Sequence, residues 1–203
     1  MTRIQVFARA PIPGQTKTRL IPALGAEGAA ALHARLIHRT LRVAREAAPG
    51  RLELWCSPDA GDDFFSACED RYGVVLREQP EGDLGARMHT ALADARAAGE
   101  HALLVGTDCP VLSADHLRRA MDWLESGVDL VLGPAEDGGY VLIGAGRAEP
   151  DLFTHMPWGT ERVFAETLAR ARDAGLAVQC LEPLPDLDRP EDLLRVNLDA
   201  LDD

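Results

Sequence analysis

Short apolar runs recur along the chain and are separated by longer polar-apolar stretches. Several of these runs are almost continuously apolar, which is typical of strands that are buried on both faces of a sheet. Seven strands are predicted, at Ile4–Ala8, Leu52–Cys56, Val74–Arg77, Ala102–Gly106, Asp129–Gly133, Tyr140–Gly144 and Leu176–Leu181.

Helical periodicity fills the longer stretches. In the clearest repeat, Leu32, Leu36, Ile37, Val43, Ala44 and Ala47 fall on one face at 3.6 residues per turn. Further helices are predicted at Leu84–Ala98, Ser113–Ser126, Thr160–Ala174 and Pro190–Leu201, with Ser113 and Thr160 as N-caps. The alternation predicts one three-layer α/β/α domain over residues 1–203, with helices on both faces of a mostly parallel sheet.

One connection does not fit a purely parallel sheet. The runs Asp129–Gly133 and Tyr140–Gly144 are separated by Pro134-Ala135-Glu136-Asp137-Gly138-Gly139. This link is too short for a crossover helix, so an antiparallel strand is expected in the second half of the sheet.

Composition narrows the class of protein. The net charge of −12 argues against binding to nucleic acid polymers or anionic membranes. No apolar run is long enough to span a bilayer, and the chain starts directly with a strand-like segment, so a soluble, cytoplasmic protein is expected. The four cysteines show no zinc or disulfide pattern, and no oligomeric state follows from the sequence.

A basic loop follows the first predicted strand. Residues 1–26 carry Arg3, Arg9, Lys17 and Arg19 and no acid, and Lys17 is the only lysine of the chain. The loop from Arg9 to Leu20 lies at the carboxyl end of a strand, where open α/β sheets bind ligands, and its cations suit a diphosphate. An ordinary solvated turn is the alternative.

Two aspartates are candidate ligands for Mg²⁺ or Mn²⁺. Asp108 follows the apolar strand at 102–105, and Pro110 keeps the next helix from starting early. Its alternative role is to close a turn. Asp188 is either a second metal ligand or, with Glu191 three residues later, the start of a helix-capping box.

Two glycine-bearing loops complete the candidate site. In the first, Glu136 and Asp137 precede Gly138-Gly139-Tyr140 and could bind acceptor hydroxyls or supply a general base, although the glycines also suit a simple turn. The second, Gln79–Gly85, enters a helix whose first turn could face a nucleotide base. The six histidines show no metal-ligand spacing.

Together these segments resemble a known family. Phe7–Leu20, Gly106–Pro110, Glu136–Gly144 and Asp186–Leu193 are similar to the glycosyltransferase A type of nucleotide-diphospho-sugar transferases. Within that type the resemblance is strongest to bacterial radical-SAM and selenodomain-associated transferases linked to arsenosugar biosynthesis. These are related to molybdenum-cofactor and phospholactate guanylyltransferases.

The resemblance implies a metal-dependent glycosyltransferase that moves a sugar from a nucleotide-diphosphate donor to a small acceptor. The sequence Asp108-Cys109-Pro110 replaces the Asp-x-Asp of many such enzymes. It therefore leaves two alternatives: a nucleotidylyltransferase that releases pyrophosphate from a nucleoside triphosphate, and an inactive nucleotide-binding or interaction module. The resemblance implies that the nucleotide contacts are Ala8, Arg9, Pro13, Gly14, Lys17, Arg19, Gln79, Gly82, Leu84 and Gly85. It implies that Mg²⁺ or Mn²⁺ is bound by Asp108 and Asp188, and that the sugar or acceptor is bound by Glu136, Asp137, Gly138, Gly139 and Tyr140. The implied catalytic residues are Asp108, Lys17 and Asp137.

Overall fold

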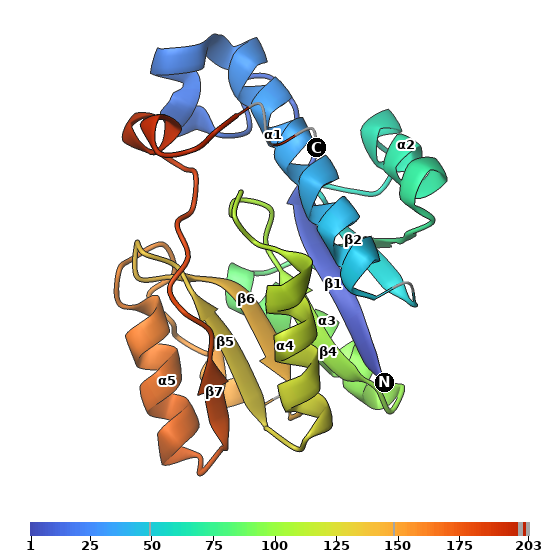
Figure 1. The fold of residues 1–203 in the computed structure, drawn as a ribbon, viewed down its shortest axis with the longest axis vertical. Coiled ribbons are helices and arrows are strands. Elements are labelled where there is room, and N and C mark those ends of the chain that lie inside the picture. The colour runs from blue at the N-terminus through green and yellow to red at the C-terminus, as the bar shows by residue number, and fades with distance from the viewer. Residues whose placement is uncertain (49, 148, 199–200, 202–203) are drawn as a thin grey trace.

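All seven predicted strands are present and form one sheet (Figure 1). The computed structural model describes residues 1–48, 50–147, 149–198 and 201. The strands are β1 Thr2–Arg9, β2 Leu52–Ser57, β3 Val75–Glu78, β4 His101–Val105, β5 Leu130–Pro134, β6 Tyr140–Ala145 and β7 Val178–Cys180.

The sheet has the order β3-β2-β1-β4-β6-β5-β7. Among the described strands only β6 runs antiparallel, pairing with β4 on one side and β5 on the other. The short link between β5 and β6 therefore returns the chain as predicted. The carboxyl ends of the six parallel strands meet at one edge, together with the start of β6 at Tyr140.

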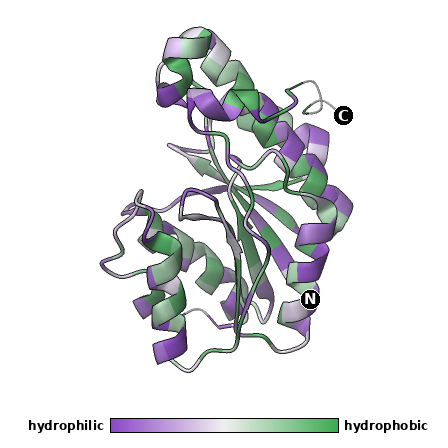
Figure 2. Cartoon of the chain, turned by 60° about the vertical axis from the view of Figure 1, so that its left-hand side comes forward, coloured by the Kyte–Doolittle hydropathy of each residue, from purple (hydrophilic) through white to green (hydrophobic). Residues whose placement is uncertain are grey.

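Helices cover both faces of the sheet and make it a three-layer α/β/α fold. Apolar side chains of α1, α2 and α4 pack with β1, β2 and β4 on one face, and those of α3 and α5 pack on the other. Figure 2 shows these helices changing between hydrophobic and hydrophilic residues, as expected for helices with one buried face. They are α1 Ile21–Ala47, α2 Asp63–Tyr72, α3 Leu84–Ala97, α4 Ala114–Glu125 and α5 Val163–Asp173, with 3₁₀ turns η1 Thr18–Leu20, η2 Pro150–Leu152 and η3 Pro190–Leu194.

Some local predictions hold and others are wrong. Ser113 caps α4, accepting a hydrogen bond from the backbone N–H of His116. Thr160 does not cap α5, because that helix starts only at Val163 and the Thr160 hydroxyl donates to the Pro157 carbonyl instead. Pro190–Leu201 is not an α-helix: the chain forms η3 and then irregular turns, and residues 199 and 200 lie outside the described residues.

The C-terminal segment crosses the strand ends and reaches α1. Figure 1 shows the chain leaving β7 and running along the sheet edge towards the first turns of α1. Leu187 and Leu201 are buried there in an apolar cluster with Leu20, Leu32 and Leu36. This crossing brings residues 186–188 to the carboxyl edge of the sheet. In the described part of the chain no helix is long and apolar enough to cross a membrane.

Candidate functional site

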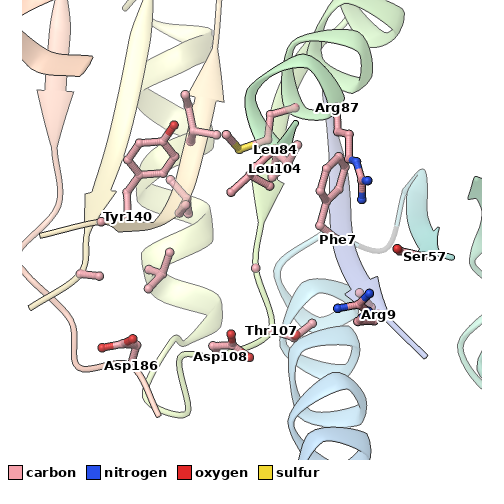
Figure 3. A pocket seen from close by; sticks show the side chains of 18 of the residues that line it. Phe7, Arg9, Ser57, Leu84, Arg87, Leu104, Thr107, Asp108, Tyr140 and Asp186 are labelled. Atoms are coloured by element: carbon pink, nitrogen blue, oxygen red, sulfur yellow. The ribbon is translucent and has the colours of Figure 1, made fainter. Parts of the chain in front are cut away.

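A cavity of about 680 Å³ opens at the carboxyl edge of the sheet. Its walls come from the ends of successive strands: Arg9 ends β1, Ser57 ends β2, Gln79 follows β3 and Asp108 lies in the loop after β4. Figure 3 shows Tyr140 and Asp186 on one side, Asp108 in the middle, and Arg9 and Ser57 on the other side. The strand order therefore divides the cavity into a β1–β2–β3 half and a β5–β6–β7 half.

The first-strand loop and the mid-chain aspartate meet beside this cavity. The Lys17 ammonium lies 2.9 Å from Oδ1 of Asp108, and it also donates a hydrogen bond to the Leu187 carbonyl. The Lys17 side chain is only 3% exposed, whereas Asp108 is 49% exposed and lines the cavity. Lys17 therefore points inward and holds a carboxylate, rather than pointing out into solvent as a free cation.

The backbone around this pair explains how the three segments stay together. Lys17 has a left-handed φ of 47° and immediately precedes η1. The backbone N–H of Leu187 donates to the Asp108 carbonyl at 2.8 Å. The β4 loop, the β1 loop and the C-terminal segment are thus joined by hydrogen bonds at one point.

Asp188 does not form the capping box that was one of its two predicted roles. Asp192, rather than Glu191, accepts hydrogen bonds from the backbone N–H groups of Asp188 and Arg189, at 3.0 and 2.7 Å. The Asp188 carboxylate instead pairs with Arg19 and lies 3.9 Å from the Lys17 ammonium. Both candidate metal ligands therefore share Lys17 as a counter-charge.

Half of the predicted nucleotide contacts line the cavity. Gly85 is buried against Trp158 rather than open to a ligand: a Cβ at this position would lie 2.7 Å from the Trp158 ring. Its lack of a side chain lets the first turn of α3 approach that ring closely. Ala8, Arg9, Gln79, Gly82 and Leu84 line the cavity, whereas Pro13, Gly14, Lys17, Arg19 and Gly85 do not.

On the other half, Asp137, Gly139 and Tyr140 line the cavity and Glu136 and Gly138 do not. Glu136 forms an ion pair with Arg195 at 2.7 Å. Gly138 has a φ of 90°, and a Cβ there would lie 2.2 Å from the Glu161 carbonyl oxygen. Gly138 is thus a point of close contact with the chain just before α5.

The polar lining residues that the sequence did not single out as contacts are His33, Ser57, Asp83, Arg87, Thr107 and Asp186. Burial raises the pKa of Asp186 to about 6, and the nearby carboxylate of Asp137 adds to this rise. Asp186 lies in irregular chain that reaches the edge through tertiary packing, and His33 lies inside the apolar repeat of α1. Adjacency to Asp108 was a usable signal for Thr107.

The acidic side chains at this edge of the sheet are suitable for binding a divalent cation, provided that a bound ligand supplies further donor atoms. Oδ1 of Asp108 is buried and forms no hydrogen bond within the described residues, although it is paired with Lys17. No three acidic, His or Cys side chains of the described chain form a ready-made metal site. Mg²⁺ is commonly held by one or two carboxylates plus substrate phosphates, so Asp108 and Asp188 are sufficient donors in number.

Comparison with known proteins defines the fold class. A "putative nucleotide-diphospho-sugar transferase" from Desulfovibrio desulfuricans G20 is 29% identical, with a TM-score of 0.84 over 98% of this chain and 93% of that one. The inositol-1-phosphate CTP transferase of T. maritima is 13% identical, with a TM-score of 0.59 over 100% and 94% of the two chains. Rv0371c of Mycobacterium tuberculosis H37Rv, in complex with manganese, is 17% identical, with a TM-score of 0.52 over 96% and 97%. The fold is that of the nucleotide-diphospho-sugar transferases.

The family follows from the sequence. The family described as "Uncharacterized protein conserved in bacteria (DUF2064)" matches residues 40–160. The chain belongs to this family. Among curated proteins no sequence matches it.

Proposed function

We propose that this protein is a divalent-metal-dependent glycosyltransferase that takes a nucleotide-diphosphate sugar as donor and a small molecule as acceptor. The observation that carries the proposal is the convergence of Lys17, Asp108 and Asp188 beside a cavity with two chemically different halves. The 29% identity to the Desulfovibrio protein over nearly the whole chain supports it.

In this proposal the two halves of the cavity bind the two ends of the donor. The nucleoside lies against Arg9, Ser57 and Gln79, and the diphosphate lies in the middle next to Asp108. The transferred sugar and the acceptor lie against Asp137 and Tyr140. This order follows the strand order, because β4 separates the β1–β2–β3 half from the β5–β6–β7 half.

The charged residues then have complementary roles. Lys17 holds Asp108 in place, and Lys17 with Arg19 supplies positive charge near the leaving diphosphate. Asp137 takes the proton of the acceptor hydroxyl as the glycosidic C–O bond to the diphosphate breaks and the new C–O bond forms. Mg²⁺ or Mn²⁺, held by Asp108 and Asp188, would neutralise charge on the leaving nucleoside diphosphate.

A second candidate is nucleotidyl transfer from a nucleoside triphosphate with release of pyrophosphate. It is favoured by Asp108-Cys109-Pro110, which offers one acid where many glycosyltransferases of this type have two. The structural similarity to a CTP transferase agrees with it. The third possibility, a nucleotide-binding module without activity, uses the same cavity and differs in showing no turnover.

The finer family resemblance belongs to the same proposal. We place the chain, as one domain of residues 1–203, with the radical-SAM and selenodomain-associated transferases that are linked to arsenosugar biosynthesis. The resemblance in Phe7–Leu20 and Asp186–Leu193 supports this placement.

The products of turnover test the proposal. Nucleotide sugars and nucleoside triphosphates are incubated with a panel of hydroxylated acceptors and Mg²⁺ or Mn²⁺, and the products are separated by mass. Release of a nucleoside diphosphate with a glycosylated acceptor supports glycosyl transfer, whereas pyrophosphate release shows the second candidate to be right. Asp108→Asn is expected to lower the rate at least a hundredfold, and Asp122→Asn, at an exposed position of α4, is the matched control. Nucleotide binding without any product would contradict both reactions.

A further inference from the structure

One buried side chain of the cavity has a hydrogen-bonding atom without a partner. His33, on α1, is 6% exposed and lines the cavity. Its Nε2 lies 3.0 Å from the carbonyl oxygen of Arg9, the last residue of β1. Its other ring nitrogen, Nδ1, is buried and has no hydrogen-bond partner among the described residues.

The contact with Arg9 determines which nitrogen carries the proton. A carbonyl oxygen only accepts hydrogen bonds, so Nε2 carries the hydrogen and Nδ1 of the neutral ring is an acceptor with a free lone pair. Burial lowers the pKa of His33, against opposing contributions from Asp108 and from the hydrogen bond to the Arg9 carbonyl, and the charges of Lys17 and Arg9 lower it further. The neutral ring is therefore the form present near pH 7.

A buried acceptor without a partner is unfavourable, which indicates that a ligand group or a bound water completes it. Phosphate oxygens are themselves acceptors and do not fit a neutral Nδ1. A hydroxyl group of the ligand does fit, because it donates an O–H. The position of His33 also limits which part of the ligand can carry this hydroxyl. His33 lies with Arg9 and Ser57 in the half of the cavity assigned to the nucleoside, near the central Asp108. The ribose is the hydroxyl-bearing part of a nucleotide that adjoins the phosphates.

We infer that Nδ1 of His33 accepts a hydrogen bond from a ribose hydroxyl of the bound nucleotide. The inference rests on the proposed function, because it requires the cavity to bind a nucleotide. It makes His33 a specificity-determining residue that distinguishes ribonucleotides from deoxyribonucleotides.

Two substitutions of His33 test the roles of its two ring nitrogens separately. In His33→Gln the side-chain amide reaches the position of Nε2, so the contact with Arg9 is kept and the Nδ1 acceptor is lost. In His33→Asn the amide oxygen takes the position of Nδ1, so an acceptor is kept and the contact with Arg9 is lost. His38→Gln is the matched control, because His38 is also on α1 but its Nδ1 contacts the Tyr72 hydroxyl at 3.1 Å outside the cavity.

The test measures binding of ADP, CDP, GDP and UDP, with Mg²⁺, in their ribose, 2′-deoxy and 3′-deoxy forms by titration calorimetry. For the wild type and His38→Gln we expect one deoxy form to bind about tenfold more weakly than the ribose form, the size of one hydrogen bond. For His33→Gln this ratio should fall to about one, and His33→Asn should restore part of it. Circular dichroism of each variant confirms that it is folded.

Three results would overturn the inference. Equal ribose and deoxyribose binding by the wild type would show that a water completes Nδ1. An unchanged ribose-to-deoxyribose ratio in folded His33→Gln would assign the discrimination to another residue. Proton uptake on binding, detected as different enthalpies in Tris and phosphate buffers, would show a protonated ring that donates to phosphate. Absence of nucleotide binding by the wild type is a different failure, since it would contradict the proposed function itself.

Discussion

The pair formed by Lys17 and Asp108 is predicted to couple energetically in the folded protein. Its distance is 2.9 Å, and Lys17 is 3% exposed while Asp108 is 49% exposed. Breaking a fully buried pair costs about 3–5 kcal/mol, and an exposed pair contributes about 0–1 kcal/mol. Because water reaches Asp108 but not Lys17, we expect each of Lys17→Met and Asp108→Asn to lower the free energy of unfolding by about 1–3 kcal/mol.

The double variant isolates the interaction. Once Lys17 is replaced, the loss of charge at Asp108 should have little further effect. The double variant should therefore lower the free energy of unfolding by about 1–2 kcal/mol less than the two single variants do in sum. Urea unfolding followed by tryptophan fluorescence gives the four free energies. The matched control is Arg118→Met with Asp115→Asn, an ion pair at 2.8 Å whose side chains are 43% and 84% exposed. Its coupling should stay below about 0.5 kcal/mol.

A coupling for Lys17 and Asp108 no larger than that of the control pair would refute this reasoning. It would mean that the three segments are not held together by this charge pair. The contact of Lys17 with the Leu187 carbonyl would then be its main stabilising interaction.

Three further predictions concern other parts of the chain. Gly138→Ala should lower the free energy of unfolding by about 2–5 kcal/mol, because the new Cβ meets the Glu161 backbone at a left-handed φ; a loss below about 0.5 kcal/mol in urea would contradict the close contact. Glu53→Gln should lower the free energy of unfolding by about 2–4 kcal/mol, because the guanidinium of Arg3, 1% exposed and 3.2 Å from the Glu53 carboxylate, loses a buried counter-charge. An unchanged thermal midpoint would show that the other acids around Arg3 are enough to neutralise it. Since burial lowers the pKa of His33, stability from its neutral ring is present above the unfolded pKa of about 6.5 and is lost below it. Lowering the pH from 7 to 5 should therefore reduce the free energy of unfolding, measured with urea, more for the wild type than for His33→Gln. Equal pH dependence of the two free energies would contradict a neutral ring.

Much of the sheet could be predicted from the sequence because its signals are local. The apolar runs locate all seven strands, and the six-residue link before Tyr140 predicts the antiparallel strand. The helix at Asp63–Tyr72 was missed because it buries only Phe65 and Cys68, too few positions for a clear repeat. The sequence predicts an α-helix at the end of the chain because the apolar residues there are spaced like those of a helix, although they pack as irregular turns against α1.

The site was predictable where residues follow directly after strands. Strand ends bring Arg9, Gln79 and Asp108 to one edge, so their order in the sequence is informative. The burial of Lys17 and the arrival of Asp186 depend on where the C-terminal segment crosses the sheet, which no local pattern encodes.

The coupling between metal and nucleotide binding tests the central claim most directly. Titration calorimetry with ADP, CDP, GDP and UDP, with and without Mg²⁺ or Mn²⁺, measures the Kd for the wild type and for Asp108→Asn. We predict that at least one diphosphate binds the wild type at least tenfold more tightly with metal, a coupling of about 1.4 kcal/mol, and that Asp108→Asn abolishes this gain. Nucleotide binding that is indifferent to metal, or a metal effect that survives in Asp108→Asn, would contradict the account.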